Sequence, residues 1–367
     1  MPLNAAPGQE APVDALLVNS PPPIRLEDAE RVARVCYPGY VQCVPLSGER
    51  DMNFRISRED GASLTLKFIN GAESLDETRM QIAVLKHLEA RRSGLGALRA
   101  PHHQPADTAD WLADPDIGPG CDDGVATRDW LSFRVPQIEG PVRVRAYGFL
   151  AGRAGTAMSA GPRSWQAVGR AAGELDAQLA GFEHPAAHRL FLWDVCQVAR
   201  VRPMLGAVEC PQERGRIAAY LDVFEQDVMP VLAALPRQII HNDLSPSNIL
   251  VDEAGTGLAG ILDFGDMVHA PRIAEIAIAA SYQMTVPGDP LDVLSAVVAG
   301  YESVSPLTPQ ERGLVLDLVL GRLVQRIAIP SWRALRFPGN GAYILRSRAA
   351  ATALFNELYG EWSQGTR

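Results

Sequence analysis

Apolar and polar residues alternate in the first part of the chain and then give way to helical spacing. Three short runs, 40–46, 52–57 and 62–69, are strand-like, and an Asp-Gly pair between the second and the third predicts a hairpin turn. Residues 74–92 carry apolar positions at helical spacing behind a serine and an acidic first turn, which predicts an amphipathic helix. Residues 130–150 return to strand character. We therefore expect this part of the chain to form a small α+β unit.

Helical spacing dominates the rest of the chain. Residues 164–235 and 273–359 carry apolar residues three and four positions apart. A further helix is expected within 24–39, where acidic residues open the pattern and a Pro-Gly pair ends it. The predicted fold class is α+β, with a small strand-rich region before a larger helical one.

Composition suggests where these regions begin and end. Proline and alanine are frequent at the N-terminus. Proline, glycine and aspartate are frequent in the stretch before residue 130. The sequence "AGRAG", residues 151–155, is a plausible hinge. The predicted organisation is a flexible tail over 1–24, an N-terminal lobe over 25–150 with a surface insertion at about 101–129, and a helical C-terminal lobe over 151–367.

Charge and cysteine content narrow the class of protein. The chain has 367 residues and a net charge of −9, which is spread evenly along it, so neither nucleic acid nor an anionic membrane is expected as a partner. The five cysteines form no Cys-x-x-Cys pair, which favours reduced thiols. No uncharged apolar run reaches about 18 residues and no export signal is evident. We expect a cytoplasmic protein.

The sequence "HNDLSPSNIL", residues 241–250, places several polar groups before an aliphatic run. Asp243 and Asn248 are separated by Pro246, which disfavours a helix and predicts an irregular loop. Further along the chain, Asp263 ends an apolar run and is followed by Phe-Gly. Oxygen-bearing side chains of this kind suit Mg²⁺ together with substrate phosphates.

The order His-x-Asp-x-x-x-x-Asn followed by Asp-Phe-Gly resembles the catalytic loop and metal-binding segment of the protein-kinase-like superfamily. The sequences "IIHNDLSPSNILVD" and "GILDFGDMVHAP" are most similar to the aminoglycoside phosphotransferase family, in the branch that contains hydroxylysine kinase and the kinase modules of some class III aminotransferases. The resemblance covers roughly residues 40–360 and rests mainly on 241–266. It implies a bilobal protein-kinase-like fold, with a small antiparallel-sheet N-lobe that binds nucleotide and a larger, mainly helical C-lobe.

The resemblance also implies roles for individual residues. Asp243 would position the substrate hydroxyl and accept its proton, while Asn248 and Asp263 would hold Mg²⁺ ions that bridge the nucleotide phosphates. His241 would support the metal-binding segment from behind by packing. Asn53 matches a loop asparagine of the family that lies near the phosphates.

Lys67 is a candidate on its own evidence. The chain has 34 basic residues, of which only Lys67 and Lys86 are lysines, and Lys67 lies within the apolar strand sequence "TLKFI". A compact ammonium fits beneath phosphates where a guanidinium does not, so Lys67 is predicted to contact the nucleotide. The expected partner is Glu77 in the following helix, with Asp76 and Glu73 as close rivals.

Substrate contacts are expected from the helical lobe. Asp194 and Asp266 are possible ligands for an amine-bearing substrate, and Met267, His269 and Trp332 are weaker candidates. The predicted function is a small-molecule kinase that uses ATP or GTP and Mg²⁺. Its acceptor would be a hydroxyl of an amino alcohol or a hydroxylated amino acid, with hydroxylysine-like compounds favoured.

Other functions remain open or are disfavoured. A catalytically silent nucleotide-binding or scaffold protein of the same fold is the main alternative, although such proteins usually lose one of Asp243, Asn248 and Asp263. A protein kinase is disfavoured because "PLSGERDMNF" has a single glycine, Gly48, where several are expected. Neither lysine belongs to a Walker-type loop, and the seven histidines form no metalloenzyme motif along the sequence.

Overall fold

The computed structural model describes most of the chain. The described residues are 17–48, 50–95, 98–107, 114–285 and 288–365. Residues 1–16 of the flexible tail predicted over 1–24 therefore lie outside the described residues.

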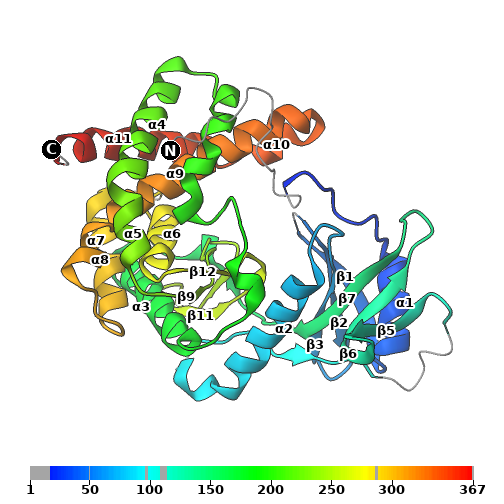
Figure 1. Cartoon of the computed structure of the whole chain (residues 1–367). Coiled ribbons are helices and arrows are strands. Elements are labelled where there is room, and N and C mark those ends of the chain that lie inside the picture. Colours follow the sequence, from blue (N-terminus) through cyan, green and yellow to red (C-terminus); the bar gives the residue numbers. More distant parts are fainter. Residues whose placement is uncertain (1–16, 49, 96–97, 108–113, 286–287, 366–367) are drawn as a thin grey trace. The chain divides into compact units, whose positions relative to one another are not determined.

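The chain divides into two compact units (Figure 1). The sheet unit is formed by Ala15–Arg91 and Arg99–Ala151, and the helical unit is formed mainly by Gly152–Arg367 with Arg92–Leu98. None of the helices in the described part of the chain combines the length and the apolar character needed to cross a membrane.

The sheet unit is built on one antiparallel seven-stranded sheet. The strand order is β1-β2-β3-β7-β6-β5, and β4 pairs with β7. The strands predicted at 40–46, 52–57 and 62–69 are confirmed, and at their hairpin turn Gly61 has a φ of +87°, a conformation that favours glycine. The strands are β1 (Tyr40–Leu46), β2 (Met52–Arg58), β3 (Ser63–Phe68), β4 (His103–Gln104), β5 (Ile117–Asp122), β6 (Val125–Arg134) and β7 (Pro141–Gly148).

The range 101–129, expected to be a surface insertion, contributes β4, β5 and the start of β6 to this sheet. Prolines and glycines obscure the strand pattern here, but Ile117 is buried in the core. Gly120 lies so close to Trp130 that an added Cβ would come within 2.4 Å of the indole ring. Glycine at this strand position therefore allows a large aromatic side chain to pack against the backbone.

The two faces of the sheet carry different side chains. Leu66 and Phe68 face the apolar core together with α1 (Leu26–Cys36), and burial of each such side chain stabilises the unit by about 1.5–3 kcal/mol. Because side chains alternate along a strand, Lys67 points to the opposite face. On that face Arg145 of β7, paired in register with Lys67, donates to Gln81 of α2 (Leu75–Ala90).

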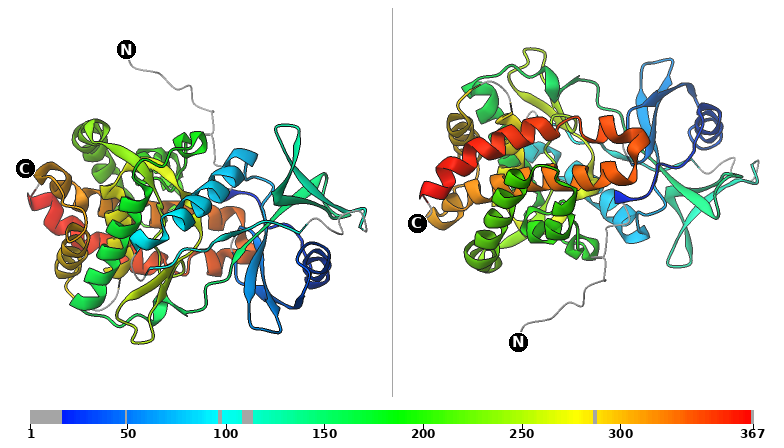
Figure 2. Two further views of the ribbon diagram at one scale, coloured as in Figure 1. Left: turned by 90° about the horizontal axis from the view of Figure 1, so that it is seen from below. Right: turned by 90° about the horizontal axis from the view of Figure 1, so that it is seen from above.

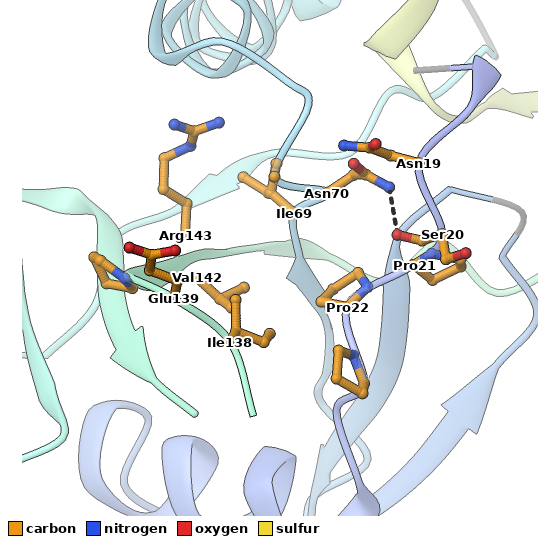
Figure 3. A pocket seen from close by; sticks show the side chains of 13 residues that line it. Asn19, Ser20, Pro21, Pro22, Ile69, Asn70, Ile138, Glu139, Val142 and Arg143 are labelled. Carbon is orange, nitrogen blue, oxygen red and sulfur yellow. Dashed lines mark hydrogen bonds between the residues drawn. The ribbon is translucent and has the colours of Figure 1, made fainter. Parts of the chain in front are cut away.

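The segment 17–24 packs on the sheet unit. Ile24 belongs to the apolar core, and the Ser20 carbonyl accepts a hydrogen bond from Asn70 Nδ2 at 3.1 Å. Beside this bond, Pro21–Pro23 and residues at the ends of β3 and β7 line a pocket of about 320 Å³ (Figure 3).

The helical unit surrounds a long buried helix, α9, which lies against α6 and α11 (Figure 2). Two helices, α3 and α7, pack closely because glycines lie at their contact, where an added Cβ on Gly169 would reach within 1.8 Å of the Val297 carbonyl. The helices of this unit are α3 (Pro162–Leu179), α4 (Pro211–Val223), α5 (Met229–Ala234), α6 (Ile273–Gln283), α7 (Pro290–Glu302), α8 (Pro309–Gly313), α9 (Val315–Arg336), α10 (Gly341–Ile344) and α11 (Arg348–Gly365).

Two small sheets in this unit carry the loops that contain the candidate residues. One has the strand order β11-β10-β8, and the other pairs β12 with β9. Their strands are β8 (Arg153–Ala154), β9 (Arg237–Ile240), β10 (Ile249–Val251), β11 (Leu258–Ile261) and β12 (Val268–Pro271). The loop 241–248 follows β9 and the segment 262–267 follows β11, so the strand pairing brings both sequence motifs together.

Candidate active site

The catalytic-loop residues and the metal-segment residues meet in the helical unit. The antiparallel pairing of β10 with β11 places Ile249 opposite Ile261. The Leu262 amide donates to the Asn248 carbonyl at 2.7 Å, which extends this pairing by one step. Asn248 and Asp263 therefore lie beside each other although fifteen residues separate them in the sequence.

Hydrogen bonds fix the orientation of the Asp243 carboxylate. Its Oδ2 accepts a bond from Asn248 Nδ2 at 2.7 Å and a longer one from the Ser245 hydroxyl at 3.4 Å. Its Oδ1 accepts from Arg322 at 3.1 Å and from the Tyr282 hydroxyl at 3.4 Å. The side chain of Asp243 is nevertheless 19% exposed, so it can still be reached by a substrate hydroxyl.

Arg322 is a site residue that the sequence did not single out. It comes from α9, is 1% exposed, and also donates to the Trp193 carbonyl at 2.8 Å. Its guanidinium lies 4.9 Å from the centre of the Trp193 ring. Arg322 thus supplies a positive charge to the loop acid from a helix that lies far away in the sequence.

The amide of Asn248 is oriented by its neighbour. Nδ2 donates to both the Oδ2 and the main-chain oxygen of Asp243, which leaves Oδ1 turned the other way. Asp263 is exposed and has a φ of 55°, and its Oδ1 caps the following turn by accepting from the Gly265 amide at 3.2 Å. The two side chains offer amide and carboxylate oxygens side by side, a donor set that fits Mg²⁺.

His241 packs against the segment that contains Asp263, and its supporting role there remains a prediction. Its ring makes an edge-on contact with Phe264, with centroids 4.9 Å apart. Nδ1 accepts the Asp243 amide at 3.3 Å, so Nε2 carries the proton and donates to the Leu262 carbonyl at 2.9 Å. His241 therefore ties the loop to the metal segment.

The loop backbone is strained at Asn242 and supported from α6. Asn242 has a φ of 68°, which asparagine tolerates better than most residues, and its amide donates to Glu275 Oε2 at 3.0 Å. Burial raises the pKa of the Glu275 carboxyl, against the lowering effects of His241 and of the Asn242 amide. The buried Glu275 carboxylate therefore accepts a hydrogen bond from the Asn242 amide, which would otherwise have no partner.

The two acidic residues considered for substrate contacts are both buried. The Asp194 side chain caps the turn that follows it by accepting from the Cys196 amide at 2.9 Å, and burial raises the pKa of this carboxyl. Asp266 is 5% exposed, and its main-chain oxygen accepts from Asn242 Nδ2 at 3.0 Å, which places it next to the catalytic loop. Their substrate roles remain predictions, and Asp266 is the better placed.

In the sheet unit, Lys67 is 3% exposed and forms an ion pair with Asp51, with 2.8 Å between Nζ and Oδ2. Asp51 Oδ1 also accepts from the Asn70 amide at 2.8 Å. The expected partner Glu77 lies in the first turn of α2, where its carboxylate accepts from the Ser74 amide at 2.6 Å and completes a capping box. The pairing of Lys67 with Glu77 remains a prediction.

The rival acid Glu73 accepts from the Thr78 hydroxyl at 2.7 Å, and the other rival, Asp76, pairs with Arg79. Asn53 is opposite Lys67 in the β2–β3 register. Its Oδ1 is a buried oxygen without a hydrogen-bond partner among the described residues, so an approaching donor would satisfy it.

Sequence reasoning missed two residues, Asp51 and Arg322, and only the first could have been predicted from the sequence. Asp51 directly precedes β2 and lies two positions before Asn53, the residue opposite Lys67, so strand register could have suggested it. Arg322 gave no such signal, because it is one arginine among many on a long helix.

Comparison with known proteins agrees with this geometry. The model of the phosphotransferase enzyme family matches residues 42–314. A hydroxylysine kinase of Mus musculus is 29% identical over 320 residues, which cover 82% of this chain and 80% of that protein. A hydroxylysine kinase of Bos taurus is 33% identical over 213 residues, covering 55% of this chain and 57% of that protein.

Solved structures agree in fold. A microcompartment-associated aminopropanol kinase has a TM-score of 0.67 at 16% identity and covers 94% of this chain and 99% of its own. An amicoumacin kinase, solved in complex with AMP-PNP, Ca²⁺ and Ami, has a TM-score of 0.63 at 15% identity, and the match covers 94% of both chains. The predicted kinase-like α+β fold is confirmed. The chain belongs to the phosphotransferase enzyme family and is a phosphotransferase.

Proposed function

We propose that the protein transfers the γ-phosphate of ATP or GTP to a hydroxyl group of an amino alcohol or a hydroxylated amino acid. Hydroxylysine-like compounds are the favoured acceptors, because two of the relatives in the comparison are hydroxylysine kinases. The observation that carries the proposal is the carboxylate of Asp243, held by Asn248 and Arg322 yet still exposed.

In this proposal Asp243 accepts a hydrogen bond from the acceptor hydroxyl and takes up its proton during transfer. Its two oxygens are fixed by donors on both sides, so it loses little freedom when the substrate binds. Such a base contributes about 10²- to 10⁴-fold to the rate. The remaining acceleration is expected from positioning and charge neutralisation.

Asn248 and Asp263 are the residues that would hold Mg²⁺. An Mg²⁺ ion held there would offset the negative charge of the nucleotide phosphates. Lys67 would contribute a further positive charge to the phosphates, with its ammonium held by Asp51. Asn53 would donate to the nucleotide through its amide, and Glu77 would support Lys67.

The amine of the acceptor is assigned to an acidic group near the loop. Asp266 supports this assignment better than Asp194, because its main-chain oxygen contacts Asn242, the residue before Asp243. The carboxylate of Asp194 is already engaged by the Cys196 amide. The proposed partners are a nucleotide and a small amine-bearing alcohol.

The test is Asp243→Asn, assayed with a panel of hydroxylated amino acids and amino alcohols by following nucleotide consumption. Wild type should phosphorylate at least one acceptor, and the variant should lose about 10²-fold or more in kcat on it. Near-wild-type turnover by the variant would contradict the mechanism.

A thermal-shift scan with Mg-ATP and Mg-GTP separates the proposal from its alternative. Wild type should be stabilised by at least one nucleotide and should also consume it with an acceptor. Stabilisation without consumption across the whole panel would favour a silent nucleotide-binding protein.

A further inference from the structure

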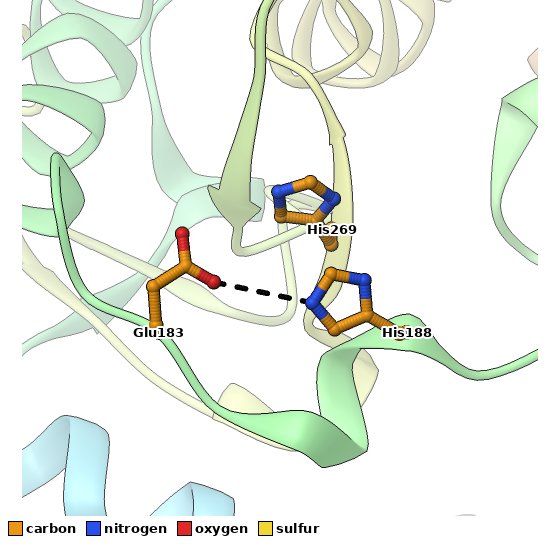
Figure 4. Close-up of side chains that lie close together, drawn as sticks. All are labelled: Glu183, His188 and His269. Carbon is orange, nitrogen blue, oxygen red and sulfur yellow. Dashed lines mark ion pairs between the residues drawn. The ribbon is translucent and has the colours of Figure 1, made fainter.

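Two histidines and one glutamate meet in the helical unit. Glu183 and His188 lie on one segment and His269 lies on another, and their ligand atoms all lie within 4.8 Å of one another. Figure 4 shows the three side chains close together, with the Glu183 carboxylate directed toward the His188 ring and the His269 ring above them. The two histidines are far apart in the sequence, so the histidine spacing along the chain gave no sign of the cluster.

His269 is held by strand pairing. It lies in β12 opposite Ile239 of β9, and its neighbours Val268 and Ala270 are buried, so its own side chain faces outward. Arg237 donates to the His269 carbonyl at 3.2 Å, which fixes the backbone at this position further. The imidazole therefore projects from a well-defined strand.

The segment that carries the other two residues is fastened to the same strand. His188 ends a short turn, Pro185–His188, and the next residue, Arg189, donates to the carbonyls of Gly265 and Met267 at 2.6 and 3.2 Å. Its guanidinium bridges the turn to the chain that enters β12. The separation of His188 from His269 is thus set by backbone contacts.

The three side chains are exposed enough to rotate toward a bound ion. Glu183 and His188 are exposed and His269 is partly buried. Ligand distances of about 2.0–2.2 Å in a tetrahedral site place ligand atoms about 3.4 Å apart, so rotations that bring them closer by roughly 1 Å complete the site. Exposed side chains can make such rotations at little cost.

The charge of the groups also suits a cation. Partial burial and the neighbouring His188 lower the pKa of His269, which keeps its imidazole neutral and able to coordinate. Glu183 acts in the opposite direction and supplies the negative charge, while Arg237 adds a positive one nearby. His188 Nε2 and Glu183 Oε2 are 3.9 Å apart, within reach of a shared ion.

We propose that Glu183, His188 and His269 form a binding site for a divalent transition-metal ion, with Zn²⁺ the best match. Two imidazoles and one carboxylate are the donors that Zn²⁺ prefers, and three protein ligands leave one position for water. Mg²⁺ prefers oxygen ligands, so it would not compete for this site. The site is separate from the Asn248 and Asp263 pair.

The competing explanation is a simple ring contact. The rings of His188 and His269 are tilted by 36° with centroids 4.3 Å apart, a geometry that contributes packing energy without an ion. That explanation predicts no metal dependence at all.

The test uses the full chain, stripped of metal by a chelator and then held in excess Mg²⁺. Titration with Zn²⁺ by calorimetry should show one tight site, and titration with Co²⁺ should give the visible absorption of a tetrahedral ion. His188→Ala and His269→Ala should each weaken binding by about tenfold or more and abolish the Co²⁺ absorption. Glu183→Gln, an exposed substitution that cannot disturb the core, should weaken it as well.

His102→Ala is the matched control, because His102 is an exposed histidine of the sheet unit. This variant should bind Zn²⁺ and Co²⁺ as wild type does. The proposal is overturned if wild type gives no Co²⁺ absorption, or if His269→Ala and Glu183→Gln bind Zn²⁺ with unchanged affinity. Melting curves without metal establish that each variant is folded before it is titrated.

Discussion

Arg322 is predicted to position the catalytic carboxylate, and replacing it by methionine tests this role. Methionine keeps the length and the apolar stem of the side chain but removes the guanidinium. The substitution deletes the bond to Asp243 Oδ1 at 3.1 Å, the bond to the Trp193 carbonyl at 2.8 Å and the contact with the Tyr282 hydroxyl at 3.4 Å. Asp243 then keeps its Oδ2 donors but loses the charge beside Oδ1.

The size of the effect follows from the burial of the pair. Removing one partner of a buried ion pair costs about 3–5 kcal/mol of unfolding free energy. Asp243 retains 19% exposure, which lets water replace part of the lost contact, so the lower end, about 3 kcal/mol, is expected. A domain with an unfolding free energy of about 5–15 kcal/mol remains folded after such a loss.

The substitution should also lower kcat, in addition to the free energy of unfolding. A less constrained Asp243 should lower kcat by about tenfold to a hundredfold, because the carboxylate must be ordered again for each transfer. The nearby positive charge favours the ionised carboxylate, so its removal should move the acid limb of the kcat/KM profile to higher pH. Arg322→Lys should restore the profile and part of kcat, since it returns the charge without the planar fork.

The matched control is Arg326→Met, one turn further along α9. Arg326 is also buried and donates to the Ser281 carbonyl at 2.8 Å, but no hydrogen bond joins it to Asp243 among the described contacts. This variant should lose stability but shift the pH profile less than Arg322→Met does, because Arg326 acts on Asp243 only through a weaker charge interaction. If Arg322→Met lost stability to the same extent yet kept the wild-type kcat and profile, Arg322 would be a structural residue only.

Three further predictions concern a proposed metal ligand, the lysine and a buried acid. Asp263→Asn should lower kcat by about 10²-fold and raise the Mg²⁺ concentration needed for half-maximal rate, whereas Glu253→Gln, an exposed change in the same hairpin, should alter neither. Lys67→Arg should remove most of the thermal stabilisation by Mg-ATP or Mg-GTP. Lys67 is only 3% exposed, so a larger guanidinium would overpack its site at a cost of about 1–3 kcal/mol. A variant that nucleotide stabilises as much as it stabilises wild type would refute this prediction. Burial, together with the nearby Glu275, raises the pKa of the Asp176 carboxyl well above its ordinary 3.8. The folded state therefore binds this proton more tightly than the unfolded chain, and wild-type stability falls as pH rises above about 4 toward the folded pKa. Asp176→Asn should remove this fall, so urea unfolding should find the variant increasingly more stable than wild type as pH rises; a constant difference would contradict the assignment.

The parts of the site that the sequence predicts are local ones. Asp243 and Asn248 share one loop, and Asp263 follows in the next strand connection, so spacing alone indicates that they meet. Lys67 is visible because lysine is rare in this chain and because it interrupts an apolar strand. In both cases the prediction rests on residues that lie near the site residues in the sequence.

The parts that the sequence does not predict depend on tertiary contacts. Arg322 reaches Asp243 across a separation of 79 residues, and nothing in the spacing of α9 distinguishes it from the arginines around it. The strands of residues 117–134 lie among prolines and glycines, where the alternation of burial is hard to recognise. The cluster of Glu183, His188 and His269 likewise exists only once β12 is folded.

The catalytic loop is supported by buried charges in a way that costs stability. Glu275 and Arg322 enter from two different helices, and Glu275 Oε1 and Arg322 Nε are buried without hydrogen-bond partners among the described residues. Each such atom costs about 1–3 kcal/mol, which an apolar side chain would avoid. Apolar side chains could fill the space, but they could not donate to Asp243 or accept the amide of Asn242. The charges are therefore better explained by the geometry of the base than by the stability of the fold, so an apolar replacement at either position should lower catalysis by more than the accompanying change in stability accounts for.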